Sequence, residues 1–153
     1  MARPSFQKAW TAFARIYGDG SLQHVSQELG GKVAANIDGG IFENACAIRM
    51  SYVLNQSGYP VTSAHGATVS AADNSKYLFR VRDLEKHLRQ RFGKPEVDGP
   101  ARERDLAGDP GLLLFTVGGW SNATGHATVW NGRSCADRCY FPQSSHIAFW
   151  KLP

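Results

Sequence analysis

Cys46 is the residue of this sequence best suited to act as a nucleophile. It stands in the segment GGIFENACAIRMSYVLNQSG (39–58), where polar Glu43 and Asn44 precede a mostly apolar run with helical character. The N–H groups and the dipole of a helix N-terminus stabilise a thiolate, and the same N–H groups can stabilise an oxyanion. Considered alone, a cysteine on an apolar helix is more often a packed hydrophobic side chain.

His126 and Asp137 favour the catalytic interpretation because they supply a base and an acid. The dipeptide Asn131-Gly132 predicts a two-residue hairpin turn, and in that register His126 lies directly opposite Asp137. A carboxylate beside an imidazole orients the ring and stabilises its protonated form. The sequence therefore predicts a nucleophile, a base and an orienting acid in Cys46, His126 and Asp137.

Three of the other histidines have no comparable partner in the sequence. We interpret His24, His65 and His87 as surface residues. His146 begins a predicted strand and is a weaker alternative base.

Cys135 and Cys139 form a C-x3-C pair whose pairing is open from the residues alone. Positions four apart in a strand are about 13 Å apart, whereas a disulfide needs Cα atoms within about 7 Å. We favour a bridge across a tight turn, which would hold Asp137 in a closed loop and form in an oxidising compartment. Two reduced, packed thiols are one alternative. A zinc site that adds Cys46 and His126 is a weaker one, because the sequence contains no CxxC knuckle.

The elements that would position these residues fall into a helical first part and a strand-rich second part. Apolar residues recur at helical spacing in four segments, 5–17, 21–31, 43–57 and 74–93. Strand-like segments follow at 112–117, 126–130 and 146–152, after a polar stretch at 93–111 that we interpret as a surface loop. This order predicts an α+β fold, with a helical N-terminal part packed on a C-terminal antiparallel sheet, in one domain spanning 1–153.

Length and composition exclude several classes of protein. A chain of 153 residues with 42% hydrophobic and 20% charged residues fits one globular domain with a sizeable core. No apolar run is long enough to span a membrane, and the N-terminus lacks the apolar region of a signal peptide. The net charge is +4, but acids interleave the basic residues at 80–94, as in the pair Glu85 and Arg89, so we expect no nucleic-acid partner.

The sequence resembles the type VI secretion amidase effectors, family four, within the papain-like, NlpC-type cell-wall amidases. The resemblance covers essentially the whole chain and is most specific in RPSFQKAWTAFARIYGDG, FENACAIRMSYVLNQSG and GHATVWNGRSCADRCY. It implies a papain-like cysteine amidase that needs no cofactor or metal and hydrolyses the γ-D-glutamyl–meso-diaminopimelate bond of peptidoglycan stem peptides. Cys46, His126 and Asp137 match the nucleophile, the base and the third member of the family's catalytic set. Cys135 and Cys139 match the family's disulfide.

The resemblance also implies a delivery route and a protein partner. Such toxins are made in the producer's cytoplasm without a signal peptide and delivered by the type VI secretion machinery to the target cell's periplasm. A cognate immunity protein blocks their active-site cleft. The alternatives are a housekeeping papain-like cell-wall hydrolase and a non-catalytic wall-binding module.

One expected feature of plant-type papain proteases is missing near the cysteine. Those enzymes carry a glutamine before the nucleophile, whereas this chain reads DGGIFENAC. The oxyanion donors must then come from elsewhere. The Cys46 backbone N–H, Asn44, Ser121 and Asn122 are the candidates.

Overall fold

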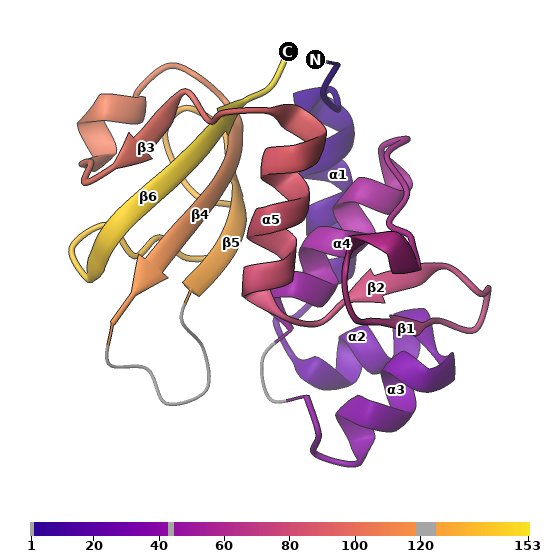
Figure 1. Ribbon diagram of the computed structural model, residues 1–153. Coiled ribbons are helices and arrows are strands. Elements are labelled where there is room, and N and C mark those ends of the chain that lie inside the picture. Colours follow the sequence, from indigo (N-terminus) through magenta and orange to yellow (C-terminus); the bar gives the residue numbers. More distant parts are fainter. Residues whose placement is uncertain (1, 43–44, 119–124) are drawn as a thin grey trace.

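In a computed structural model, helices pack against a four-stranded antiparallel sheet (Figure 1). The structure describes residues 2–42, 45–118 and 125–153. The helices are α1 (Phe6–Tyr17), α2 (Leu22–Leu29), α3 (Gly31–Asp38), α4 (Cys46–Gln56) and α5 (Val81–Phe92), with short 3₁₀ helices η1 (Ser63–His65) and η2 (Glu103–Leu106). The strands are β1 (Thr68–Ser70), β2 (Lys76–Leu78), β3 (Val97–Gly99), β4 (Gly111–Val117), β5 (Gly125–Trp130) and β6 (Ser144–Lys151). Within these described ranges, no helix has the length and apolar character needed to cross a membrane.

The first two helices begin where the sequence predicts, because serine side chains cap them. The Ser5 hydroxyl accepts a hydrogen bond from the Lys8 N–H at 3.2 Å, and the Ser21 hydroxyl accepts one from the His24 N–H at 3.0 Å. Each bond satisfies an N–H group that lacks a partner within its own helix.

The sequence prediction misses α3, because a Gly-Gly pair is typical of a helix end. Gly30 and Gly31 have φ values of 62° and 59°, and the chain turns there into a new helix. A Cβ atom on Gly31 would lie 2.6 Å from the carbonyl carbon of Ala71. Glycine therefore allows both the turn and the close approach of the two backbones.

The predicted helix at 74–93 is wrong in its first third, which forms part of the β1–β2 hairpin. Asn74 lies in the connection between the strands with φ 69°, and Tyr77 and Leu78 belong to β2. These two buried residues fall at helical spacing with the apolar residues of α5, so periodicity alone could not separate them from it.

The predicted surface loop at 93–111 is also partly wrong. It contains the short edge strand β3, in which Val97 pairs with Phe149 of β6, and the 3₁₀ helix η2. Three residues are too few to show the alternation that indicates a strand.

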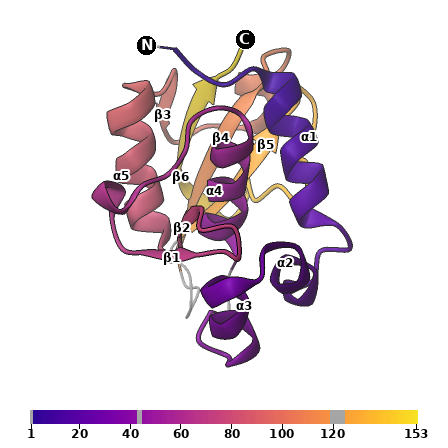
Figure 2. The ribbon, with the colours of Figure 1, turned by 90° about the vertical axis from the view of Figure 1, so that its right-hand side faces the viewer.

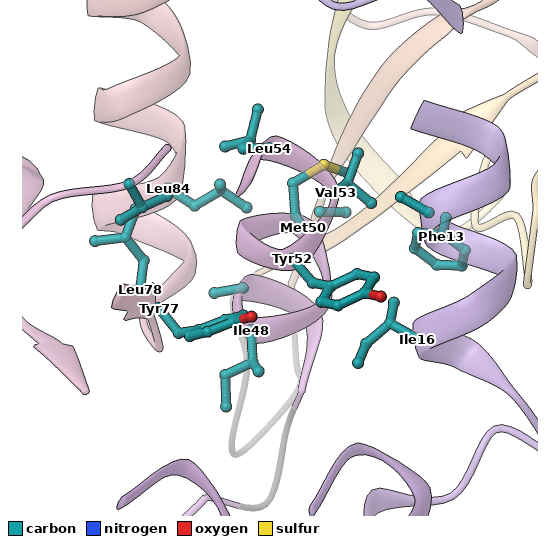
Figure 3. Packing of buried hydrophobic residues seen from close by; sticks show 14 of the residues in the cluster. Phe13, Ile16, Ile48, Met50, Tyr52, Val53, Leu54, Tyr77, Leu78 and Leu84 are labelled. Carbon is teal, nitrogen blue, oxygen red and sulfur yellow. The ribbon is translucent and has the colours of Figure 1, made fainter. Parts of the chain in front are cut away.

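Helix α4 is the centre of the helical layer, as its nearly continuous apolar character predicts. Figure 3 shows its side chains between those of α1, such as Phe13, and those of β2 and α5, such as Leu78 and Leu84. Every residue from Cys46 to Leu54 except Arg49 is buried. The core packing on all sides fixes where the first residue of this helix lies.

The four-stranded sheet has the order β3-β6-β4-β5 and places apolar residues on both faces. Helices α5, α4 and α1 lie side by side over one face (Figure 2), which carries Leu112, Leu114, Ala127, Val129, Ala148 and Trp150. The opposite face carries Leu113, Phe115, Trp130, Ile147 and Phe149. The predicted α+β fold, with a helical part packed on an antiparallel sheet, is confirmed.

The segments before α1 and after β6 are tied together at one end of the molecule (Figure 1). The Phe6 N–H donates to the Pro153 carbonyl at 2.7 Å. Arg3 donates to the carbonyls of Lys151 at 2.8 Å and Phe92 at 3.0 Å, and it forms an ion pair with Glu96. We call this set of contacts the terminal clasp.

Candidate active site

Cys46 is the first residue of α4 and faces β5. Its side chain is buried, and its sulfur lies 3.0 Å from Nδ1 of His126. The backbone bond from the Arg49 N–H to the Ala45 carbonyl, at 2.7 Å, is the first of the helix. Among the residues that the structure describes, no side chain caps this helix. The N-terminal end of a helix carries a partial positive charge, which favours an anion at this position.

The His126 ring is held between aromatic side chains. It lies opposite Phe115 in the β4–β5 register, and the two rings stack with centroids 6.4 Å apart. Tyr140 packs edge-on against it with centroids 4.8 Å apart. These contacts fix the plane of the imidazole, so that Nδ1 faces Cys46 and Nε2 faces the opposite way.

Asp137 lies on the far side of the imidazole from Cys46. Its Oδ2 atom is 2.9 Å from Nε2 of His126, and the two side chains are 5% and 9% exposed. The carboxylate lies off the N–H direction of the ring, so the contact is an ion pair when His126 is protonated. The other carboxylate oxygen, Oδ1, accepts a hydrogen bond from the Thr128 hydroxyl at 2.6 Å.

The structure brings His126 and Asp137 together, but the predicted hairpin register is wrong. The turn has four residues, in which the Asn131 side chain accepts from the N–H groups of Arg133 and Ser134. Trp130 then pairs with Cys135, which puts Thr128 rather than His126 across from Asp137. Alternate residues of a strand share a face, so Asp137 still reaches His126 by a diagonal contact.

A disulfide joins Cys135 to Cys139, whose Cα atoms are 5.5 Å apart. The segment between them is a tight loop, as a bridge requires, and it carries Asp137 at its centre. The bond uses both sulfurs, which removes Cys135 and Cys139 from the alternative zinc site. Within the described part of the chain, no group of three or more His, Cys, Asp or Glu residues is arranged to hold a metal ion.

The electrostatics of the site favour a protonated His126. Burial opposes protonation, but the contacts with Asp137 and Cys46 outweigh it and raise the pKa of His126 to about 9. Burial would likewise raise the pKa of Asp137, but His126, with help from Thr128, lowers that pKa below its usual value. The site thus holds an imidazolium between a carboxylate and a sulfur at neutral pH.

The remaining histidines take other places. His146 pairs with Asp98 on β3, 2.7 Å away, in an exposed position. His24 and His65 are half-buried rather than on the open surface. His87 is 1% exposed, so the expectation of a surface residue is wrong for it.

The oxyanion candidates Asn44, Ser121 and Asn122 lie outside the described residues. The Cys46 backbone N–H stands at the start of α4, where the helix geometry favours an oxyanion. Sequence reasoning did not single out Thr128 or Tyr140, which also contact the His126–Asp137 pair. For Thr128, the available signal was its position two residues after His126 in the same strand, which places both side chains on one face.

Comparison with known proteins places the chain in a family. A family model described as "Type VI secretion system (T6SS), amidase effector protein 4" matches residues 42–150. No match was found among curated protein sequences.

Solved structures extend the similarity over the full length. The Tae4–Tai4 effector–immunity complex from Enterobacter cloacae contains a chain with 41% identity and a TM-score of 0.93, covering 99% of this chain and 100% of the other. The corresponding complex from Salmonella Typhimurium gives 41% identity, the same coverage and a TM-score of 0.92. The effector Tae4 from Enterobacter cloacae gives 42% identity and a TM-score of 0.92, covering 99% and 98% of the two chains. This protein belongs to the type VI secretion system amidase effector 4 family, and it is an antibacterial amidase.

Proposed function

We propose that the protein hydrolyses the amide between the γ-carboxyl of D-glutamate and meso-diaminopimelate in peptidoglycan stem peptides. Cys46 is the nucleophile, His126 the acid–base and Asp137 the residue that orients His126. The observation that carries these roles is the 3.0 Å contact between the Cys46 sulfur and Nδ1 of His126 at the start of α4. The family membership supports amide hydrolysis, and the choice of this bond follows from the resemblance described above.

The first half of the reaction forms a thioester. The thiolate of Cys46, paired with protonated His126, attacks the γ-carbonyl carbon, and the N–H groups at the start of α4 stabilise the oxyanion. Collapse of the tetrahedral intermediate breaks the C–N bond. The proton on Nδ1 of His126 passes to the leaving amine of diaminopimelate.

The second half regenerates the enzyme. Nδ1 of His126, now neutral, takes a proton from water, and the hydroxide attacks the thioester carbonyl. The C–S bond then breaks, which restores the thiolate beside the protonated His126. The γ-carboxylic acid of D-glutamate leaves and gives up its proton to solvent. Asp137 stays ionised throughout, because its contact with His126 favours the charged carboxylate.

A partner and a site of action belong to the same proposal. Two of the three similar structures described above are complexes of Tae4 with the immunity protein Tai4. We expect a cognate immunity protein to bind this chain and block access to Cys46 in producing cells. The toxin would act in the periplasm of the target cell, where its substrate lies.

Digestion of purified Gram-negative peptidoglycan tests the reaction. Wild-type protein should release muropeptides cut between D-glutamate and diaminopimelate, identified by mass spectrometry. Cys46→Ala should remain folded by circular dichroism and release none. An alanine variant that still cuts this bond would refute the nucleophile assignment, and a different cut bond would refute the substrate assignment.

Alkylation of Cys46 tests the site without any substrate. A thiolate held by His126 should react rapidly with iodoacetamide below pH 7, whereas an inert thiol in a wall-binding module would react slowly. His126→Ala should slow the reaction, since it removes the group that stabilises the thiolate. Equal, slow rates in both proteins would contradict the proposed pair.

A further inference from the structure

Thr128 of strand β5 is a polar residue that lies among apolar side chains of the sheet. It is completely buried and lies opposite Leu113 of β4, on the face that also carries Phe115 and Trp130. Valine has nearly the same shape and would suit these neighbours, whereas a buried hydroxyl is unfavourable unless it is hydrogen-bonded. The hydroxyl at this position therefore needs an explanation other than packing.

Among the described residues, the hydroxyl of Thr128 has Asp137 as its hydrogen-bond acceptor. It donates to Oδ1 of Asp137 at 2.6 Å, while Oδ2 of the same carboxylate contacts Nε2 of His126 at 2.9 Å. A carboxylate that is held at both oxygens cannot rotate about its own axis without losing one of the two contacts. Hydrogen bonds of this kind, to an ionised acceptor, are also stronger than neutral ones.

The backbone places this contact with little freedom. Trp130 forms an isolated bridge with Cys135, and the Ala136 N–H donates to the Val129 carbonyl at 2.8 Å. Asp137 follows directly after these two backbone contacts, and its carboxylate lies beside Thr128. The Cys135–Cys139 bridge then turns the chain away directly after it. Thr128 is thus the residue of β5 that binds the carboxylate of the disulfide-bridged loop.

We propose that Thr128 is a positioning residue of the amidase, whose hydroxyl holds the Asp137 carboxylate ionised and aimed at His126. It acts through Asp137 and touches neither Cys46 nor the substrate. Among the residues that the structure describes, the titratable groups that face the His126 ring are Cys46 from α4, Asp137 from the loop between Cys135 and Cys139, and Tyr140 after that loop. Removing the Thr128 hydroxyl loosens the Asp137 contact alone. This inference rests on the proposed function for its catalytic consequence but not for its effect on the His126 pKa.

The test compares Thr128→Val, which keeps the shape and removes the hydroxyl, with Thr128→Ser, which keeps the hydroxyl. On peptidoglycan fragments, Thr128→Val should lower kcat by about tenfold or more with KM within about twofold, the loss typical of a hydrogen bond to a charged group. Thr128→Ser should retain kcat within about threefold. The alkaline limb of the rate profile should move to lower pH in Thr128→Val, because a loosened Asp137 stabilises the imidazolium less.

A titration of His126 by nuclear magnetic resonance separates this proposal from the enzymatic one. The pKa of His126 should fall by about half a unit or more in Thr128→Val and stay near the wild-type value in Thr128→Ser. This readout needs no substrate, so it remains decisive even if the wild-type protein fails to cut peptidoglycan. Thr116→Val is the matched control, since it makes the same change on the other face of the sheet, and it should leave the pKa of His126 unchanged.

A double-mutant comparison asks whether Thr128 acts through Asp137. Thr128→Val should cost little further activity in an Asp137→Asn background. Thr128→Ala provides a second hydroxyl-free variant if the valine variant does not fold, which thermal melting would reveal. The proposal is overturned if hydroxyl-free variants keep both the kcat and the His126 pKa of the wild type, or if their losses add fully to that of Asp137→Asn.

Discussion

His126 and His87 are both buried, yet their surroundings move their pKa values in opposite directions. His126 is buried, and its pKa rises to about 9 because Asp137 and Cys46 outweigh the effect of burial. His87 is 1% exposed, and burial lowers its pKa to about 4, with help from the positive charge that His65 and Arg91 bring near it.

The difference lies in the sign of the neighbouring charge. The ring of His87 packs against that of His65, with centroids 3.9 Å apart and the two planes tilted, and its Nε2 atom has no hydrogen-bond partner among the described residues. His126 faces an acid across one nitrogen and a sulfur across the other. Burial alone therefore keeps a histidine neutral, as a packing residue. A carboxylate beside the buried ring keeps it protonated, and the imidazolium can then stabilise a thiolate.

Removing the charge of Asp137 should have the largest effect, because it makes His126 resemble His87. We expect Asp137→Asn to lower kcat by on the order of a hundredfold or more. The pKa of His126, followed by nuclear magnetic resonance, should fall below its wild-type value of about 9. The matched control is Asp98→Asn, which neutralises the acid of the exposed His146–Asp98 pair and should leave kcat unchanged. Similar losses in both variants would mean that the effect is general rather than local to the site.

The two histidines should also shape the pH dependence of folding in opposite ways. The folded pKa of His87, about 4, lies below the value of about 6.5 expected when unfolded, so stability is lost as pH falls from 6.5 toward 4. We expect His87→Leu to remove roughly 3 kcal/mol of this loss, measured by urea unfolding at several pH values. An unchanged acid slope would show that His87 does not titrate in this range.

The contribution of His126 runs the other way, because its folded pKa is raised. Its stabilisation is fully present below about pH 6.5 and is lost as pH rises through 9. His87→Leu should leave that alkaline part of the stability profile intact, which provides an internal control.

Removing the disulfide should change the surroundings of His126 and leave those of His87 unchanged. We expect Cys135→Ser/Cys139→Ser to lower the free energy of unfolding by about 2 kcal/mol, the value for a short closed loop. It should also lower kcat and the pKa of His126, since the bridged loop presents Asp137. Wild-type protein treated with a reductant should behave like the double variant. A loss of stability without any change at His126 would contradict a role for the bridge in placing Asp137.

The smallest effect is expected at His146, which has an acid but no sulfur beside it. His146→Asn should change the unfolding free energy by less than about 1 kcal/mol, as for other exposed ion pairs, and kcat by less than about twofold. Peptidoglycan digestion and urea unfolding check both values. A large loss of activity would reinstate His146 as a candidate base.

The parts of the fold that local chemistry determines could be predicted from the sequence. Ser5 and Ser21 cap helices that start where expected, and the apolar surface of α4 predicts its central place. Helix α3 could not be predicted, because the meaning of Gly31 depends on its contact with Ala71, forty residues away. The prediction of a helix at Tyr77 was wrong for a similar reason. Tertiary packing buries this residue, and its spacing from the other apolar residues also fits a helix.

The candidate site could be predicted in its members but not in its geometry. The expected contact between His126 and Asp137 forms although the predicted register is off by two residues, because a shift of two keeps a side chain on the same face. The length of the turn depends on the Asn131 side chain, which bonds two N–H groups and so favours a four-residue loop over a two-residue one.

The terminal clasp has a mechanical consequence. A pulling force applied through the segments before α1 and after β6 is borne first by the bonds from Phe6 to Pro153 and from Arg3 to its carbonyl acceptors. Those bonds lie at the far end of the molecule from the start of α4 and the start of β5 (Figure 1). The hydrogen bonds of the terminal clasp therefore break before the force reaches Cys46, so the clasp protects the geometry of the site against tension on the chain ends.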